Sequence, residues 1–534
     1  MTHHDRNESR ARTDSENCSP LPAWHASVWH ASFRMAVVAA AGLAAAALMA
    51  TGMTGCADMS GIAPQASMRD APSLGLAASG QAASTDVPAE WWRGFGDKQL
   101  NEIMAQALQT SPTLKLAQAR LSRAQAVIEV TNAAALPQLN GQLDITSQRY
   151  TANSAVPPPL AGSVRNSGTA QLSGSWELDF FGKNRALLDA ALGSANAAQA
   201  DAQAARVLLA SQVARTYFQV LRLNEQAVLA RRTLDQRTQT LKLVQDRVNA
   251  GLDTRLELRQ SEGGLPEARL QLETVQEQLG LTRNALAALA GQAPDAAGAA
   301  GKADFSAKNS LFRQVLPALS AIKNVANATS IPADLLGRRA DVAAARWRVE
   351  ATSQDVASAK AQFYPNVNLV AFAGLSSIGL NRLVDAGSQQ WGVGPALRLP
   401  IFDAGRLRAN LRSKTADLDA AVESYNSAVV DAVRDVADQV TSMQAIDRQQ
   451  IEQRAAQNAA EGAYDIAVQR YKAGLGNYLN VLTAETSVLA QRRQAVDLSA
   501  RALDTQVALI RALGGGDMPA PAAGQPPALA LLKP

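Results

Sequence analysis

The sequence has very few of the residues on which nucleophilic and metal-dependent catalysis rely. All four of its histidines lie within the first 30 positions, and it has two cysteines, Cys18 and Cys56. If residues 1–55 are removed during export, the mature chain keeps one cysteine and no histidine. That excludes an internal disulfide, a histidine ligand and a histidine base. No nucleophile motif or carboxylate pair stands out. We therefore expect no enzyme, no metal site and no bound cofactor.

The chain also lacks a marked excess of charge and is poor in aromatic residues. It carries 51 Lys and Arg against 47 Asp and Glu, a net charge of +4, and 4% of its residues are aromatic. So small a surplus gives no reason to expect a nucleic-acid partner. With 47% hydrophobic residues and abundant alanine, the composition suits long, closely packed helices better than an aromatic-rich core.

The first 56 residues have the features of an export signal that ends in a lipid-modified cysteine. Residues 36–50 form an apolar run that is too short to span a membrane and suits a signal peptide. The small residues before Cys56 resemble a bacterial lipoprotein processing site. We expect cleavage after residue 55, with diacylglycerol and an N-linked acyl chain such as palmitate on Cys56, followed by a tether over 56–90. The alternative is an ordinary secretory signal with an incidental cysteine.

The rest of the chain contains an internal repeat. Residues 247–252, RVNAGL, match residues 470–475, RYKAGL, 223 positions later. The match continues downstream, where Leu256 corresponds to Leu479 and Glu262 to Glu485. A repeat of this length indicates a duplicated supersecondary unit. We assign a first repeat to 91–290, a linker region to 291–335, a second repeat to 336–513 and a flexible tail to 514–534.

Each repeat is predicted to contain helices and two strands in the same order. Proline and glycine positions, together with the hydrophobic periodicity, set the expected bounds. In the first repeat we expect helices over 99–135, 183–249 and 254–290, and strands over 138–150 and 167–181. In the second repeat we expect helices over 338–363, 404–473 and 476–512, and strands over 365–376 and 389–402.

The predicted strands alternate between apolar and polar residues, as in TAQLSGSWELDF over 169–180. This pattern predicts a sheet with one oily and one wet face, and the strand 365–376 follows it least well. A layer of a soluble sandwich would show it too. The length of the strands and their unbroken polar face favour a membrane barrel. Aromatic residues at the strand ends would form two interfacial girdles, namely Phe180, Phe181, Tyr364 and Phe402 at one rim, and Tyr150 and Trp391 at the other.

Four strands cannot close a barrel, and unpaired strand edges are not tolerated in lipid. Two copies would give eight strands with a filled interior, whereas three give twelve and leave a conduit. We therefore expect a homotrimer. In 404–473 the apolar residues recur at spacings of three and four, and a helix of about 65 residues would be ~100 Å long. The alternative is a soluble coiled-coil rod.

Several motifs together resemble the TolC-like outer-membrane efflux family, in particular its lipoprotein branch serving RND-type tripartite multidrug pumps. The resemblance implies an α+β membrane protein, in which a trimeric 12-stranded β-barrel is continued by a long α-helical coiled-coil barrel in the periplasm. It also implies an equatorial collar near 291–335, a periplasmic adaptor (membrane fusion) protein and an inner-membrane pump. The motifs are WW with FGD at 91–97, WELDFFGK at 176–183, LPIFDAGR at 399–406, and RYKAG with NYL at 470–479.

The same resemblance assigns roles to residues of the two helix turns. Adaptor docking falls on Gly251, Leu252, Leu256, Gly474 and Leu475, although the glycines are equally explained by a tight turn between helices. The periplasmic gate falls on Leu479, Asn480, Thr483 and Glu485. Relatives often carry aspartate where Asn480 and Thr483 stand here, which puts an acidic gate ring in doubt. Glu485 would supply nearby charge or would simply face solvent.

These features predict an outer-membrane channel of an efflux system. It would be lipid-anchored and extend into the periplasm, and it would passively conduct small toxic compounds from the pump and adaptor to the cell exterior. The alternatives are a duct for protein secretion or metal export, and a structural lipoprotein that conducts nothing. Nothing in the sequence identifies the cargo, the pump or the adaptor.

Overall fold

The computed structural model describes residues 58–69, 87–153, 155–293, 316–323 and 335–516. The predicted signal peptide, Cys56, and most of the linker and of the C-terminal tail lie outside these residues. The chain divides into two units, Met1–Ser60 and Gly61–Pro534, and every helix and strand below belongs to the second unit.

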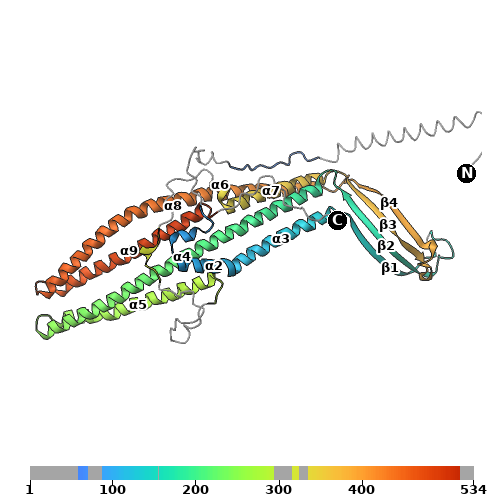
Figure 1. The fold of residues 1–534 in the computed structure, drawn as a ribbon. Coiled ribbons are helices and arrows are strands. Elements are labelled where there is room, and N and C mark those ends of the chain that lie inside the picture. Colours follow the sequence, from blue (N-terminus) through green and yellow to red (C-terminus); the bar gives the residue numbers. More distant parts are fainter. Residues whose placement is uncertain (1–57, 70–86, 154, 294–315, 324–334, 517–534) are drawn as a thin grey trace, which may run out of the picture. The chain divides into compact units, whose positions relative to one another are not determined.

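Apart from short 3-10 helices, the two halves of the described chain contain the same succession of α-helices and strands (Figure 1). In the first half these are η2 (Trp91–Phe95), α2 (Lys98–Thr110), α3 (Pro112–Ala134), β1 (Gln138–Arg149), β2 (Val164–Leu178), α4 (Lys183–Asn249) and α5 (Arg255–Leu289). In the second half they are α6 (Leu335–Arg338), α7 (Ala340–Ala361), β3 (Asn366–Ile378), β4 (Gln389–Arg398), α8 (Arg406–Lys472) and α9 (Tyr478–Ala512). Helices α4 and α8 both have 67 residues, and α5 and α9 both have 35.

The four strands form one antiparallel sheet in the order β1-β2-β3-β4. Its register confirms the predicted oily and wet faces. One row across the oily face reads Gly141, Leu172, Ala373 and Trp391, and the next row on the wet face reads Gln142, Gln171, Gly374 and Gln390. The strand that alternates least in sequence, β3, contributes Leu369 and Leu375 to the oily face but also places Val370 and Phe372 on the wet face.

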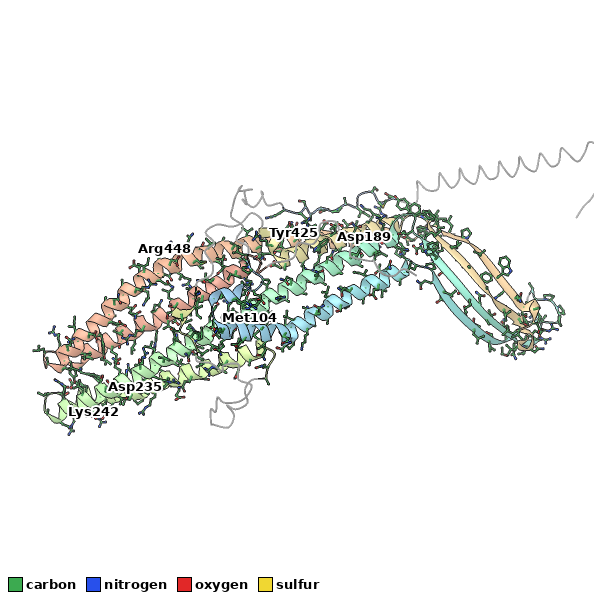
Figure 2. All side chains as sticks on the ribbon, in the orientation of Figure 1. Met104, Asp189, Asp235, Lys242, Tyr425 and Arg448 are labelled. Atoms are coloured by element: carbon green, nitrogen blue, oxygen red, sulfur yellow. The ribbon has the colours of Figure 1, made fainter. Side chains whose placement is uncertain are left out.

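The long helix of each half is accompanied by two shorter helices. Helices α3 and α5 pack against α4, and α7 and α9 pack against α8; α4 also contacts α7 and α9, which joins the halves (Figures 1 and 2). Gly193 of α4 allows a close approach to α7, because a Cβ there would lie 3.1 Å from the Cα of Ala351. Among the described helices, none combines the length and the apolar character needed to cross a bilayer.

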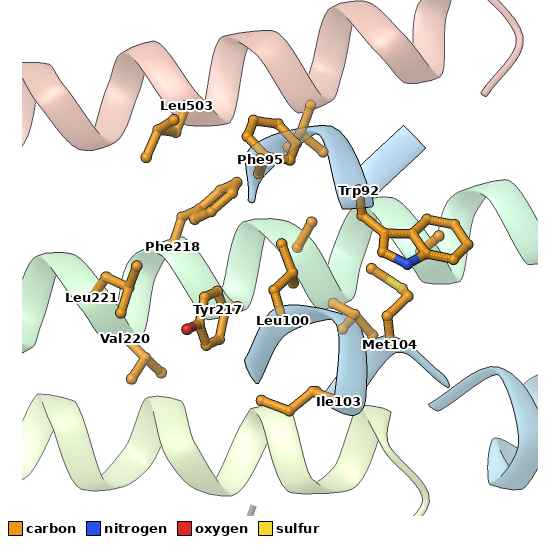
Figure 3. Packing of buried hydrophobic residues seen from close by; sticks show 14 of the residues in the cluster. Trp92, Phe95, Leu100, Ile103, Met104, Tyr217, Phe218, Val220, Leu221 and Leu503 are labelled. Carbon is orange, nitrogen blue, oxygen red and sulfur yellow. The ribbon is translucent and has the colours of Figure 1, made fainter. Parts of the chain in front are cut away.

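The largest hydrophobic cluster lies where η2 and α2 meet α4, α5 and α9 (Figure 3). Trp91, Trp92 and Phe95 are almost fully buried in it. Asp97 begins α2 by accepting hydrogen bonds from the backbone N–H groups of residues 99 and 100, at 2.8 and 3.3 Å. Its other carboxylate oxygen accepts the hydroxyl hydrogen bond of Tyr217. The WW and FGD motif thus anchors the start of the helical part to the middle of α4.

One predicted helix is wrong, because the expected helix over 99–135 is two helices in the structure. Helix α2 ends at Thr110 and α3 begins at Pro112, while Ser111 between them has a non-helical ψ of 126°. Proline lacks a backbone donor and disfavours helical geometry in the residue before it. The expected strands 167–181 and 389–402 also end earlier, at Leu178 and Arg398, because strand-to-helix turns follow them.

Both long helices begin at a glycine in the left-handed conformation. Gly182 before α4 has a φ of 76°, and Gly405 before α8 has a φ of 84°. Asp403 supports the second turn by accepting hydrogen bonds from the N–H groups of Gly405 and Leu407, at 3.0 and 2.8 Å. The FFGK and FDAGR motifs are therefore the turns that lead from the sheet into α4 and α8.

Candidate functional site

The two helix turns predicted to meet a partner have the same backbone geometry. Gly251 between α4 and α5 has a φ of 72°, and Gly474 between α8 and α9 has a φ of 73°. In each turn the next N–H, from Leu252 or Leu475, donates to a carbonyl five residues back, at 2.9 and 2.8 Å. This is a Schellman-type helix end, which requires a residue that tolerates positive φ. We call these two turns the helix tips.

Capping interactions fix the first turn of the helix that follows each tip. Thr254 and Glu257 form a reciprocal capping box at the start of α5. Asn477 caps α9 by accepting a hydrogen bond from the N–H of Asn480 at 3.1 Å. The predicted gate position Asn480 is thus held through its backbone by a neighbouring cap.

Four leucines at the helix tips are exposed in the single chain. Leu252 is 65% exposed, and its counterpart Leu475 is 70% exposed. One turn into the following helices, Leu256 and Leu479 are 63% and 55% exposed. Single exposed leucines are ordinary, but the same exposed pair at both tips makes these leucines candidates for binding another protein.

A partly buried ion pair at one helix tip also contacts the other tip. Arg247 at the end of α4 donates to both carboxylate oxygens of Asp253, at 2.9 and 3.2 Å, and to the backbone oxygen of Tyr471, at 3.1 Å. Its guanidinium carbon lies 4.5 Å from the Tyr471 ring centroid, and the Tyr471 hydroxyl donates to Asp253. The hydrogen bond from Arg247 is the main reason why the pKa of Asp253 is lowered. We call these three residues the tip lock.

The predicted gate residues occupy two different surfaces of α9. Leu479, Asn480 and Thr483 are exposed, and the Thr483 hydroxyl donates to the Leu479 carbonyl at 2.9 Å. Glu485 is instead buried, with its carboxylate 3.5 Å from the guanidinium of Arg237 on α4. Burial raises the pKa of Glu485, and the nearby arginine only partly offsets that effect. Glu485 therefore does not share a surface with Leu479, Asn480 and Thr483, the other predicted gate residues.

Sequence reasoning did not identify the tip lock or the partner of Glu485. Arg247 and Tyr471 both stand in the repeated RVNAGL and RYKAGL motifs, so the motif was the available signal. Nothing in the sequence paired Tyr471 with Asp253, which lies 218 residues earlier in the chain. The predicted lipid site, Cys56, lies outside the described residues.

The oily face of the sheet is largely uncovered in the single chain. At one end of it η5 (Leu380–Arg382) packs on β2 and β3, with Leu380 and Leu383 beside Gly168. Large apolar side chains over the rest of the face are strongly exposed: Leu139, Leu143, Ile145, Leu172, Trp391, Val393 and Leu397. A contiguous apolar face of this size indicates contact with lipid or with another chain. The wet face carries amide and hydroxyl groups, and Gln390 donates to Gln171 across it at 2.9 Å.

The sequence matches the family model described as outer membrane efflux protein over residues 103–292 and 331–515. The fusaric acid resistance protein FusA of Burkholderia cepacia is 36% identical over 68% of this chain and 67% of its own length. The pyoverdine export outer membrane protein OpmQ of Pseudomonas aeruginosa is 32% identical over 82% of this chain and 90% of its own.

Solved structures show the same fold. The crystal structure of the outer membrane protein VceC from Vibrio cholerae is 37% identical and superposes with a TM-score of 0.72, covering 80% of this chain and 99% of VceC. An outer-membrane channel, OprN, is 25% identical with a TM-score of 0.73, covering 86% of this chain and 97% of that one.

Proposed function

Because this chain belongs to the outer membrane efflux protein family and is an outer-membrane channel component of an efflux system, we propose that three copies build one passive conduit for small toxic compounds. The uncovered oily face of the four-stranded sheet is the observation that carries this proposal.

The edges of the sheet support a trimer. In the part of the chain that the structure describes, β1 and β4 pair on one side only. Backbone groups without partners are costly in lipid, so the edges must be joined to other strands. Three copies supply twelve strands around a lumen lined by the wet face, with the oily face toward the membrane.

The helices would continue the conduit into the periplasm. Helices α4 and α8 each span 67 residues, or about 100 Å at ~1.5 Å per residue. Both begin directly after the strands and end at the helix tips. The channel entrance is accordingly assigned to the tips, far from the sheet along the helix axes.

The helix tips would bind the periplasmic adaptor and hold the gate. The exposed leucines at 252, 256 and 475 provide the apolar contact, and the glycines at 251 and 474 allow another chain to approach. Leu479, Asn480 and Thr483 form an apolar and amide-lined constriction without an acidic side chain. Opening separates the α8–α9 hairpin from the α4–α5 hairpin, and an inner-membrane pump of the RND type supplies the energy.

The names of relatives support small organic cargo. They include proteins of fusaric acid resistance, of pyoverdine export and of multidrug resistance.

Lipidation of Cys56 by diacylglycerol and an amide-linked acyl chain would add a second attachment to the outer membrane. Cys56→Ser should abolish incorporation of labelled palmitate, whereas Cys18→Ser, which changes the predicted signal peptide, should leave it intact.

Conductance in planar bilayers tests the channel directly. Purified protein should form ion-conducting pores, and chemical cross-linking should yield trimers. A bilayer-inserted protein that never conducts, with or without an adaptor, would contradict the proposal.

Leu256→Asp should impair efflux in cells while cross-linked trimers persist, because charge weakens the apolar docking surface. Leu256→Met keeps the surface apolar and should retain efflux.

A further inference from the structure

An extended segment close to the N-terminus of the second unit is fixed along α8. The carboxylate oxygen Oδ1 of Asp419 accepts hydrogen bonds from two successive backbone N–H groups, that of Gln65 at 2.9 Å and that of Ala66 at 3.0 Å. The Ala66 side chain packs against the buried cluster around Val422 and Tyr425. A single carboxylate that binds two consecutive amides holds the backbone whatever side chains the segment carries.

A second side chain on α8 repeats this contact further along the segment. Asn426 Oδ1 accepts a hydrogen bond from the N–H of Arg69 at 2.9 Å, and its Nδ2 donates to the carbonyl of Ser67 at 3.1 Å. Asn426 is 5% exposed. Since Asp419 and Asn426 are seven residues apart, they lie on one face of the helix. We call this pair the α8 clamp.

The α8 clamp also sets the direction of the segment. Going from Gln65 to Arg69, the contacts advance from Asp419 to Asn426, away from the sheet end of α8. At Gln65 the N-terminal direction of the segment is therefore toward the sheet end of α8. Asp419 lies 13 residues into α8, which is about 20 Å along its axis. The nine residues from Cys56 to Gln65 can extend about 30 Å, enough to reach the beginning of α8.

We infer that Asp419 and Asn426 are positioning residues for the lipid anchor, because they shorten the tether to Cys56 and direct it toward the sheet end of α8. The inference rests on the proposed lipidation of Cys56. Without the α8 clamp, the next described residue that packs against the helices is Val87, 31 residues beyond Cys56. A flexible tether of 31 residues instead of 9 lowers the effective concentration of its end roughly sixfold. The α8 clamp thus shortens the chain between Cys56 and its first fixed contact.

Trypsin cleavage provides a direct test of the α8 clamp. Arg69 is the first Lys or Arg after Cys56, and the next is Arg93, so cleavage at Arg69 releases the acylated peptide. In membranes that contain the full-length trimer, the double variant Asp419→Ala with Asn426→Ala should lose its palmitate-labelled peptide about tenfold faster, because four backbone hydrogen bonds are lost. Asp438→Ala, which removes an exposed carboxylate on the same helix, should cleave at the wild-type rate. Equal rates for all three proteins would overturn the clamp.

A genetic comparison tests whether the α8 clamp acts through the lipid. Loss of the α8 clamp in the double variant Asp419→Ala with Asn426→Ala (clamp loss) should lower the amount of trimer assembled in the outer membrane. It should have no further effect when Cys56→Ser is already present. Inserting 22 Gly and Ser residues between Ser60 and Gly61 lengthens the tether from 9 to about 31 residues, so it should reproduce clamp loss while leaving the clamp intact. If clamp loss lowers assembly equally with and without Cys56, its role is structural and the inference is wrong. Conductance of purified trimers tests the channel separately and should be unchanged in all these variants.

Discussion

Arg247 and Asp253 form a bidentate ion pair across the tip of the α4–α5 hairpin, and the same arginine donates to the backbone of Tyr471 on α8. Both side chains of the pair are largely shielded from solvent, with exposed fractions of 11% for Arg247 and 9% for Asp253. Because Tyr471 belongs to the other repeat, the pair links the two hairpins whose separation we propose opens the channel. On that proposal the tip lock favours the closed arrangement.

Replacing Asp253 with Asn should loosen the tips. The loss of charge-assisted hydrogen bonds costs about 1.5–3 kcal/mol, which raises the population of separated tips roughly tenfold to a hundredfold. Spin labels at Asn249→Cys and Lys472→Cys would report this as a longer distance between α4 and α8 in electron resonance measurements. Asp246→Asn, which removes an exposed carboxylate near the end of α4, is the matched control. Identical distance distributions in all three proteins would mean that the lock does not hold the tips.

The tip lock should withstand mild acid. The hydrogen bond from Arg247 lowers the pKa of Asp253, so the folded state binds a proton at this carboxylate more weakly than the unfolded state does. The stabilisation is present above the ordinary carboxyl pKa of about 3.9 and disappears as the pH falls through the lowered value. The spin-label distances should stay constant from pH 7 to about pH 5. Separation of the tips within that range would contradict the assigned protonation state.

The long helices could be predicted from the sequence because their ends depend on local chemistry. Gly182, Gly251, Gly405 and Gly474 mark positions that need a positive φ, and they delimit α4 and α8 to within two residues of the prediction. The signal for the break between α2 and α3, Pro112, is equally local. It did not change the prediction of one helix because the apolar pattern continues through it. Local signals of this kind determine where elements begin and end, but they do not determine which faces meet.

The environment of Glu485 could not be predicted for that reason. Its place on α9 relative to the tip suggested a gate residue, but its burial depends on Arg237, which lies 248 residues earlier on α4. No sequence pattern singles out Asp419 and Asn426 either. Both side chains bind backbone groups of residues 65–69. Because nearly every residue type has these groups, such a contact cannot be recognised from residue types.

Glu485 should make stability depend on pH in the opposite sense to Asp253. Burial raises its pKa, so the folded state binds a proton there more tightly than the unfolded state, and this group favours folding increasingly as the pH falls through the raised value. Glu485→Gln removes that contribution. The difference in unfolding temperature between wild type and variant, followed by circular dichroism in detergent, should shift in favour of the wild type on going from pH 8 to pH 5. A constant difference would show that Glu485 stays ionised or is not buried. Glu262→Gln, at the corresponding position of the first repeat, is the control.

Gly392 on the wet face of β4 should not tolerate even a methyl group. A Cβ at this position would lie 2.7 Å from the ring of Phe372 on the neighbouring strand, whereas a Cβ at Gly394, two residues further along the same face, would meet nothing within 4 Å. Gly392→Ala should therefore destabilise the sheet by about 1–3 kcal/mol through overpacking, and Gly394→Ala should change stability much less. Thermal unfolding of both variants in detergent would measure the difference. Because the contact is with an aromatic ring, adding Phe372→Ala to Gly392→Ala should recover part of the loss, and a purely additive result would place the cause elsewhere.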